Sequence, residues 1–249
     1  MKLSQVMDVI REQVGRDKIS DPQLDWCVQR GLRELEKRDN FYWMEKTRDL
    51  MVFTDRQQYY LYRDELYGFN MPNFKETDVL WIGDMTEDEP RWSEVIGPQP
   101  IKDVRQNFAT TDSDTPGIWT MDENDGDPII SFWPPLPDQD YSLKWEHFQW
   151  TTLPTDVNSE AHEVLRRWPE ALIYLGIEQA VLTATKDPQL AAYWRRLFVD
   201  DTNPSQPSEY KRIMLYQQTR HNQRRHDRPT NNGNAELSAR RRTNERTWF

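Results

Sequence analysis

The stretch IISFWPPLPDQDYSLKW, residues 129–145, decides the central part of the fold. It contains two β-type runs separated by a loop that three prolines stiffen, because proline cannot donate to a strand ladder. Alternation places Tyr141, Leu143 and Trp145 on one face of the second strand, a spacing typical of a core or an interface. A carbohydrate platform is the alternative, but it needs several exposed rings in one plane, so the core or interface interpretation is favoured.

Outward from this stretch, residues 43–150 consist of short β-type runs broken by Gly, Pro, Asn and Asp. Asp125-Gly126 predicts a hairpin turn between two of the runs, and Ile101–Phe108 a short helix. The predicted strands are Leu50–Phe53, Tyr59–Tyr62, Val79–Ile82, Trp92–Ile96, Ile118–Met121, Ile129–Trp133 and Tyr141–Phe148.

Helical periodicity flanks this β region on both sides. Residues 2–14 carry their apolar side chains on one helical face, and Ser20 three residues before Gln23 predicts a capping box at the start of a second helix. After residue 159 the period of three and four returns, with Pro169 at a kink or in a first turn.

A last periodic segment opens at Asp187-Pro188, a good cap and first-turn pair. In it Leu190, Trp194, Leu197 and Phe198 are expected to face the core. The predicted class is therefore α+β: a terminal α-helical bundle (1–42 and 151–202), a central antiparallel β insertion (43–150) and an extended basic C-terminal arm (203–249).

Composition narrows the classes of function. The 249 residues include one cysteine, Cys27, so no intramolecular disulfide is expected. The sequence contains no run of 18 apolar residues, so no membrane span is expected. The acidic run DENDGD, 122–127, fails the EF-hand pattern, and the four histidines lack zinc spacing. Without a phosphate loop or a nucleophile-elbow motif, we expect no enzyme activity, no metal and no cofactor.

Charge is distributed unevenly along the chain. Residues 211–249 hold ten Lys or Arg against three acidic residues, a net charge of +7, whereas the other 210 residues hold 22 basic and 39 acidic ones, a net charge of −17. Low apolar content means that the tail cannot build a core, so we expect it to lie on another protein chain. A nucleic-acid contact and a solubilising tail are the alternatives, while Trp248-Phe249 favours docking in a protein pocket.

Several segments, in this order, resemble the head-to-tail adaptor, or connector, proteins of tailed bacteriophages over residues 3–201. They are DNFYW (39–43), TPGIWTMD (115–122), IISFWPPLPDQDYSLKWEHF (129–148), TTLPTD (151–156), WPEALIYLGIEQAV (168–181) and QLAAYWRRLF (189–198).

The resemblance implies a structural protein of the virion neck, assembled in the host cytoplasm. It implies a ring, twelvefold in many members, that docks below the portal protein through the C-terminal arm. The ring would extend the DNA channel without binding DNA specifically and would offer an attachment site to a tail or nozzle protein. The alternatives are a nucleic-acid-binding virion protein that acts through its basic tail and, less favoured, a carbohydrate-binding protein.

Two sets of residues follow as expected contacts. Those of the arm with the portal are Tyr210, Arg212, Met214, Leu215, Tyr216, Arg220, Arg224, Arg225, Arg228, Arg240, Arg241, Arg242, Arg246, Trp248 and Phe249. Those of the β insertion with a neighbouring subunit or the tail are Trp133, Pro134, Pro135, Pro137, Tyr141 and Trp145.

Overall fold

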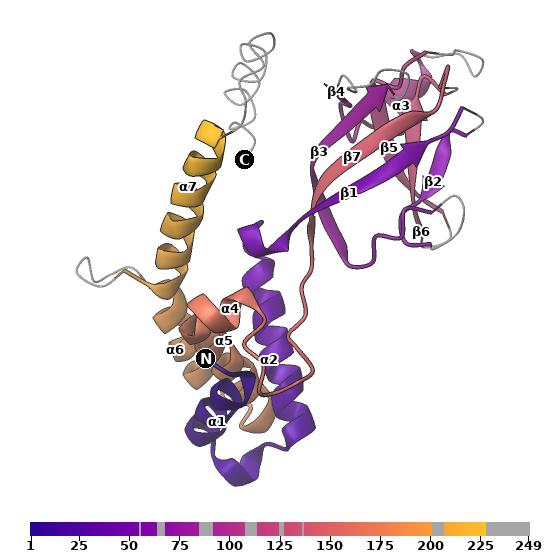
Figure 1. Cartoon of the computed structure of the whole chain (residues 1–249). Coiled ribbons are helices and arrows are strands. Elements are labelled where there is room, and N and C mark those ends of the chain that lie inside the picture. The colour runs from indigo at the N-terminus through magenta and orange to yellow at the C-terminus, as the bar shows by residue number, and fades with distance from the viewer. Residues whose placement is uncertain are drawn as a thin grey trace.

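The computed structural model describes residues 1–54, 56–63, 68–84, 92–107, 114–124, 127–135, 137–200 and 207–227. Figure 1 shows a helical part at one end of the molecule and a β part at the other, connected through the long strands β1 and β7. The helical part combines segments from before and after the β part, which is an insertion between them. The predicted α+β class, a terminal bundle around a central antiparallel insertion, is confirmed.

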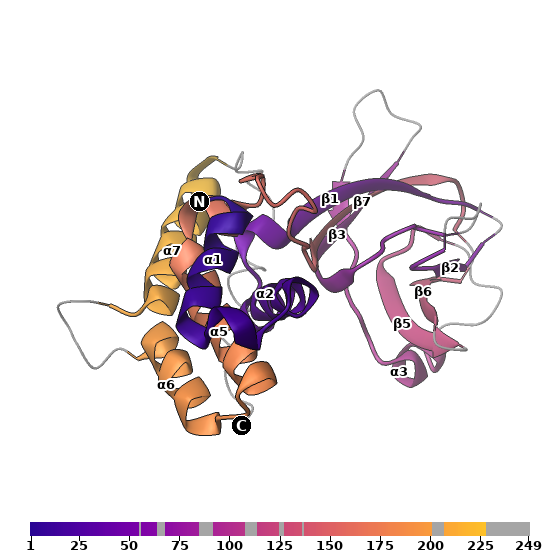
Figure 2. The ribbon, with the colours of Figure 1, turned by 90° about the horizontal axis from the view of Figure 1, so that it is seen from below.

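The bundle is organised around one central helix, α5 (Pro169–Ala184). Apolar residues surround this helix, so it can be buried on several sides, and it packs between α2 and α6 and against α1 (Figure 2). Among the described residues, no helix combines the length and apolar character needed to cross a bilayer. The other elements of the bundle are α1 (Leu3–Val14), η1 (Arg16–Lys18), α2 (Asp21–Glu36), α4 (Glu163–Arg167), α6 (Pro188–Val199) and α7 (Glu209–Asp227).

Local signals set the ends of these helices. Ser20 caps α2, and its backbone N–H donates to Gln23 Oε1 at 3.0 Å, as the capping-box pattern predicts. Pro169 was predicted either at a kink or in the first turn of a helix. The structure places it in the first turn, because α4 ends before Pro169 and α5 begins at Pro169. The carboxylate of Asp187 accepts the backbone N–H groups of Gln189 and Leu190 at 2.9 and 3.0 Å and caps α6.

The β insertion contains two antiparallel sheets. After η2 (Tyr42–Met44), one sheet has the order β1-β7-β3-β4 and the other the order β2-β6-β5. Asn124 pairs with Asp127 across β5 and β6, while the predicted turn at Asp125-Gly126 lies outside the described residues. The elements are β1 (Glu45–Val52), β2 (Gln58–Tyr60), β3 (Phe74–Asp84), β4 (Trp92–Glu94), α3 (Ile101–Arg105), β5 (Ile118–Asn124), β6 (Asp127–Trp133) and β7 (Tyr141–Gln149).

The two sheets enclose an aromatic core that is separate from the core of the bundle. Trp145 of β7 is fully buried and contacts Trp119 and Phe69 edge-on, with ring centroids 5.7 and 5.6 Å apart. Phe69 stacks on Tyr59 at 4.9 Å. The alternation in residues 141–145 was compatible with a core or an interface, and the structure shows that these side chains form the core.

The prediction for the face of α6 is only partly right. Phe198 is buried and Trp194 is partly buried against the bundle, but Leu190 and Leu197 are 40% and 39% exposed. The bundle meets α6 through the face that carries Ala191 and Phe198, so the stripe beside that face remains in contact with solvent.

The predicted extended arm does not begin at residue 203. Residues 209–227 form the helix α7 instead, and its first turns pack on the bundle. Ile213 is fully buried there and Tyr210 contacts Phe198 at a ring distance of 5.7 Å. The three-residue spacing of Tyr210, Ile213 and Tyr216 produces this apolar face. An extended arm could therefore begin only after the helix ends at Asp227.

Candidate functional site

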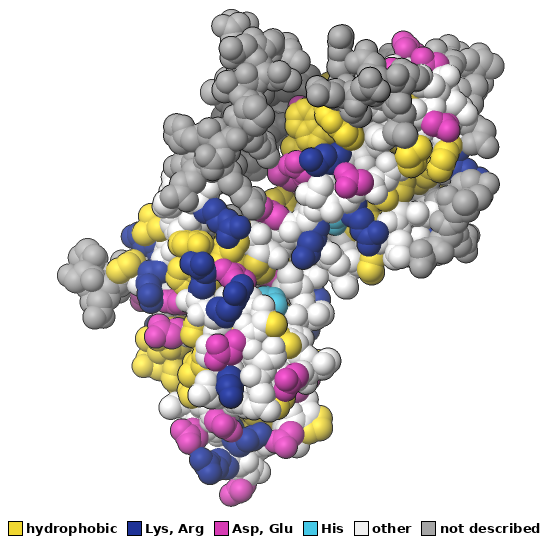
Figure 3. Space-filling view, in the orientation of Figure 1, with side chains coloured by type: hydrophobic (Ala, Val, Ile, Leu, Met, Phe, Trp, Pro, Cys, Tyr) yellow, Lys and Arg dark blue, Asp and Glu magenta, His cyan; other side chains and the backbone are white. Residues whose placement is uncertain are grey.

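A polar groove of about 610 Å³ lies where the bundle, α7 and the start of the β insertion meet. Figure 3 shows Lys and Arg side chains gathered over α7 and α4 on this face of the molecule. The residues that line the groove are Tyr42, Trp43, Lys46, Thr151, Thr152, Ala161, His162, Glu163, Arg166, Arg167 and Arg220. With four cations and one carboxylate in its wall, the groove favours an acidic partner.

The carboxylate in the wall belongs to Glu163 and organises its surroundings. Arg166 and Arg167 both form ion pairs with it, the second at 2.6 Å, and the hydroxyl of Tyr42 donates to it at 2.9 Å. Burial opposes ionisation of Glu163, but these partners outweigh burial and lower its pKa below the usual value. Burial, together with this neighbouring carboxylate, raises the pKa of Tyr42 to about 12.

Stacked aromatic rings and guanidinium groups attach α7 to this wall. Arg220 of α7 lies 4.3 Å from the ring centroid of Tyr42, and Arg167 of α4 lies 5.1 Å from that of Tyr216. The rings of Tyr42 and Tyr216 are 5.5 Å apart, and Trp168 meets Tyr216 at 5.6 Å. Cation–π contacts of this kind contribute about 0.5–1 kcal/mol each where they are exposed, so together they fix the base of α7.

A buried hydrogen-bond chain lies beside the groove. The carboxylate of Glu36, at the end of α2, accepts the hydroxyl and backbone N–H of Thr151, and also Trp43 Nε1 at 3.3 Å. His162 Nδ1 accepts the N–H of Val164 at 3.2 Å, so its other nitrogen carries the proton and donates to the Thr151 oxygen at 2.7 Å. Glu36 precedes the segment that enters the β insertion, and Thr151 follows the last strand of the insertion. These hydrogen bonds therefore join the two segments that connect the insertion to the bundle.

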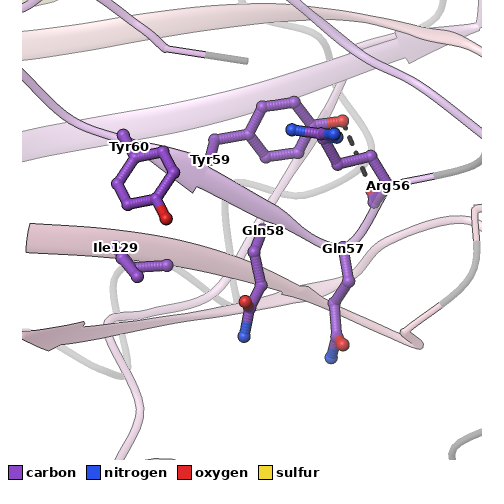
Figure 4. Close-up of a pocket in the computed structure, with 6 residues that line it drawn as sticks. All are labelled: Arg56, Gln57, Gln58, Tyr59, Tyr60 and Ile129. Carbon is purple, nitrogen blue, oxygen red and sulfur yellow. Dashed lines mark hydrogen bonds between the residues drawn. The ribbon is translucent and has the colours of Figure 1, made fainter. Parts of the chain in front are cut away.

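A second hollow, of about 330 Å³, lies on the small sheet along β2 and β6. Figure 4 shows Tyr59 pointing into the protein with its hydroxyl on the carbonyl of Arg56, at 3.3 Å, while Gln57 and Gln58 point the other way. The Tyr59 hydroxyl also accepts the N–H of Phe53 at 2.7 Å. These hydrogen bonds are made within the β insertion. The described residues contain no cluster of His, Cys, Asp and Glu suited to a metal ion.

The residues predicted for portal contact lie in different surroundings. Arg212 pairs with Glu209 at 2.6 Å, Met214 packs against the bundle, and Leu215 is 51% exposed. Tyr210, Tyr216 and Arg220 contact the bundle or η2 as described above. Arg224 and Arg225 lie on the second half of α7. Outside the described residues are Arg228, Arg240, Arg241, Arg242, Arg246, Trp248 and Phe249.

The residues predicted for a subunit or tail contact lie within the β insertion instead. Trp133, Tyr141 and Trp145 are 6%, 2% and 0% exposed, Pro135 and Pro137 are buried, and Pro134 is half-buried. Tyr141 and Trp145 face the aromatic core between the two sheets, and Trp133 and the prolines are covered elsewhere in the chain. A subunit or tail contact through these six residues stays a prediction, and most of their apolar surface is already buried within the chain. The same burial contradicts a sugar platform of exposed rings.

Sequence reasoning missed most of the groove. Glu163 with Arg166 and Arg167 follows a three-and-four charge spacing on a helix that could have been noticed. Glu36 and His162 gave no signal, because their partner Thr151 is 115 and 11 residues away and the contacts exist only in the folded chain.

Comparison with known proteins gives the family. No curated protein matches the chain. The family model described as SU10 adaptor protein matches residues 1–228, which include the bundle, the β insertion and the whole of α7. The chain therefore belongs to the SU10 adaptor protein family, a family of phage head-to-tail adaptors.

Proposed function

We propose that this protein forms a ring, twelvefold as the sequence resemblance implies, which docks below the portal and extends the DNA channel. The ring also provides the attachment site of the tail. The observation that carries the proposal is family membership combined with a basic face, on α4 and α7, that leads into the basic segment 228–249.

Family membership itself makes the chain a structural protein of the phage neck, where adaptors assemble with the portal and the tail. The docking route is the proposed part. The base of α7 is held on the bundle by Ile213 and by the rings of Tyr210 and Tyr216. Whatever follows Asp227 therefore starts from a fixed position on the body.

The segment after α7 is long enough to reach a neighbouring ring. Its 22 residues, 228–249, would span roughly 73 Å if fully extended, at ~3.3 Å per residue. One exposed ion pair contributes only about 0–1 kcal/mol. Several segments that bind one ring gain by effective concentration, so weak contacts can make a durable joint.

Two truncations test this route on the purified full-length protein and its portal. Removal of residues 228–249 is expected to leave the melting temperature unchanged and to abolish portal binding, because α7 and Ile213 are retained. Removal of residues 207–249 also removes a buried side chain and is expected to destabilise the bundle, so it serves as a control for loss of fold. Full portal binding by the shorter truncation would contradict the docking route.

The groove is tested separately by charge reversal. Lys46 is exposed at its wall, so Lys46→Glu is expected to weaken portal binding while the fold is kept. Arg16→Glu is the matched control, because Arg16 is 73% exposed on η1 and does not line the groove. Equal binding by the two variants would remove the groove from the docking face.

DNA binding through the basic segment 228–249 is the second candidate, favoured by the gathering of cations on the face that leads into it (Figure 3). It predicts that the full-length protein binds duplex DNA with an affinity that falls steeply with salt and is lost with residues 228–249. Portal binding without any DNA affinity at low salt would leave docking as the function of this face.

A further inference from the structure

Helix α6 carries an apolar stripe that its own chain leaves exposed. Leu190, Tyr193 and Leu197 recur at three and four residues and are 40%, 53% and 39% exposed. Tyr193 meets Trp194 edge-on at 5.6 Å, and Trp194 stacks on Tyr174 of α5 at 6.2 Å. Figure 3 shows hydrophobic side chains gathered over this helix. A contiguous exposed patch of this kind marks an interaction site.

The opposite side of the bundle carries a second exposed aromatic feature. Trp26 of α2 is 51% exposed, and the guanidinium of Arg30 lies 5.6 Å from its ring centroid. Because α5 packs between α2 and α6, these two features lie on opposite sides of the bundle (Figure 2). Two different surfaces on opposite sides are what a head-to-tail contact between identical subunits requires.

Charge distinguishes between the possible pairings of these surfaces. Helix α6 has no acidic residue within its bounds; Arg195 is paired with Glu178 of α5, whereas Arg196 is exposed, so two copies of α6 would place the Arg196 cations against each other. On α2, Asp25 is exposed beside Trp26 in the sequence, while Asp21 at the start of the helix is paired with Arg11. A contact between α6 and α2 therefore pairs opposite charges and covers both apolar features.

We propose that the α6 stripe of one copy docks on the Trp26 face of α2 in the next copy, and that this heterologous contact closes the ring. The ring of Tyr193 meets the Trp26 and Arg30 pair, and Leu190 and Leu197 lose their exposure to water. Removal of these apolar side chains from water favours the association. The inference rests on the proposed ring and names the surfaces that form it.

Cross-linking of cysteine variants tests the contact directly. Gln189→Cys places a thiol beside the stripe and Pro22→Cys places one on α2 a helical turn before Trp26, while the single native thiol, Cys27, is buried. With a short bifunctional maleimide, the double variant is expected to give a ladder of trimers and higher species. Each single variant is expected to give dimers at most. Wild-type protein, with Cys27 alone, sets the background.

The matched control is Gln189→Cys combined with Arg16→Cys, which moves the second thiol to η1. The pair with Pro22→Cys is expected to yield higher species on the order of tenfold more than this control, because the contact holds the two thiols at high effective concentration. Equal ladders in both pairs, or efficient dimers from Gln189→Cys alone, would overturn the heterologous contact. A ladder absent both with and without the portal would also overturn it.

Stability separates an interface role from a folding role. Tyr193→Ser and Leu197→Ser together are expected to weaken self-association by on the order of tenfold or more, which corresponds to about 1.4 kcal/mol, while the melting temperature of the dissociated chain stays the same. A large drop in melting temperature with unchanged association would contradict the proposal. Full portal binding by the protein that lacks residues 228–249, with an intact ladder, would count against the docking route and leave this contact in place.

Discussion

The hydroxyl of Thr151 lies 2.7 Å from Nε2 of His162 and also donates to the buried carboxylate of Glu36. Thr151 follows β7, the last strand of the β insertion, whereas His162 caps α4 and Glu36 ends α2. Lys75 of β3 adds to this junction, because its ammonium group donates to the carbonyls of Glu36 and Asp39 at 2.5 and 2.7 Å. The angle between bundle and β insertion therefore depends on a small set of polar contacts.

Replacement of the central hydroxyl should weaken this junction. Thr151→Val keeps the shape of the side chain but leaves the carboxylate of Glu36 without one partner in a buried site. The free energy of unfolding should fall by about 2 to 4 kcal/mol, measured by urea denaturation. Thr152→Val is the matched control, because Thr152 is exposed and its replacement should change stability by less than about 0.5 kcal/mol. Equal losses in the two variants would contradict the role of the chain Glu36–Thr151–His162.

His162 should make the protein less stable in acid. Burial lowers its pKa to about 4, from an ordinary value of 6.5. Between these two pH values the unfolded chain binds a proton that the folded chain does not, so stability is fully present above pH 6.5 and falls as the pH drops towards 4. The full loss is about 3 kcal/mol for this group.

His147 and Glu36 also contribute to the change of stability with pH. His147 is buried with a lowered pKa and adds a loss of the same sign, while burial raises the pKa of Glu36 and offsets part of it. Urea denaturation of wild type and His162→Gln at pH 7 and pH 4.5 isolates His162. The variant should lose clearly less stability between the two pH values, and parallel losses would assign the acid sensitivity to other groups.

Gly31 allows α2 and α5 to approach closely. A Cβ atom at this position would lie 3.0 Å from the backbone nitrogen of Gly176 and 3.2 Å from the carbonyl carbon of Leu175. Gly31→Ala should therefore push the two helices apart and lower the melting temperature, with a cost of about 1 to 3 kcal/mol for overpacking. Gly117→Ala, where nothing lies within 4 Å, is the control. A stabilised Gly31→Ala protein would show that helix propensity outweighs the close contact.

The ion pair between Arg195 of α6 and Glu178 of α5 should matter more than a surface pair. Glu178 is 3% exposed, and its Oε1 lies 2.6 Å from the guanidinium. Arg195→Ala removes that partner and should cost about 2 to 3 kcal/mol, less than for a fully buried pair because Arg195 is half exposed.

Two further variants check this ion pair. Arg196→Ala removes a neighbouring exposed cation and should leave the urea midpoint unchanged. Glu178→Leu combined with Arg195→Ala should recover most of the loss, because it removes the buried charge together with its partner. A double variant as unstable as Arg195→Ala alone would point to lost packing in place of an unpaired carboxylate.

The order and type of the elements followed from local sequence. The capping box at Ser20, the proline that opens α5 and the alternation in β7 each act within a few residues. Such signals are properties of the chain itself, so periodicity and caps were enough to predict the class. The helix α7 lies within the segment predicted as an extended arm, because its polar far side masks the periodicity of its buried face.

The sequence by itself thus determined a helical bundle interrupted by antiparallel strands, together with the contrast between acidic body and basic tail. Only the tertiary structure decided which apolar faces find a partner within the chain. It buried Trp145, left Leu190 and Leu197 exposed, and brought Tyr42, Glu163 and Arg220 to one groove. Spacing along the chain reports which residues share a face, but what covers that face depends on segments far away in the sequence.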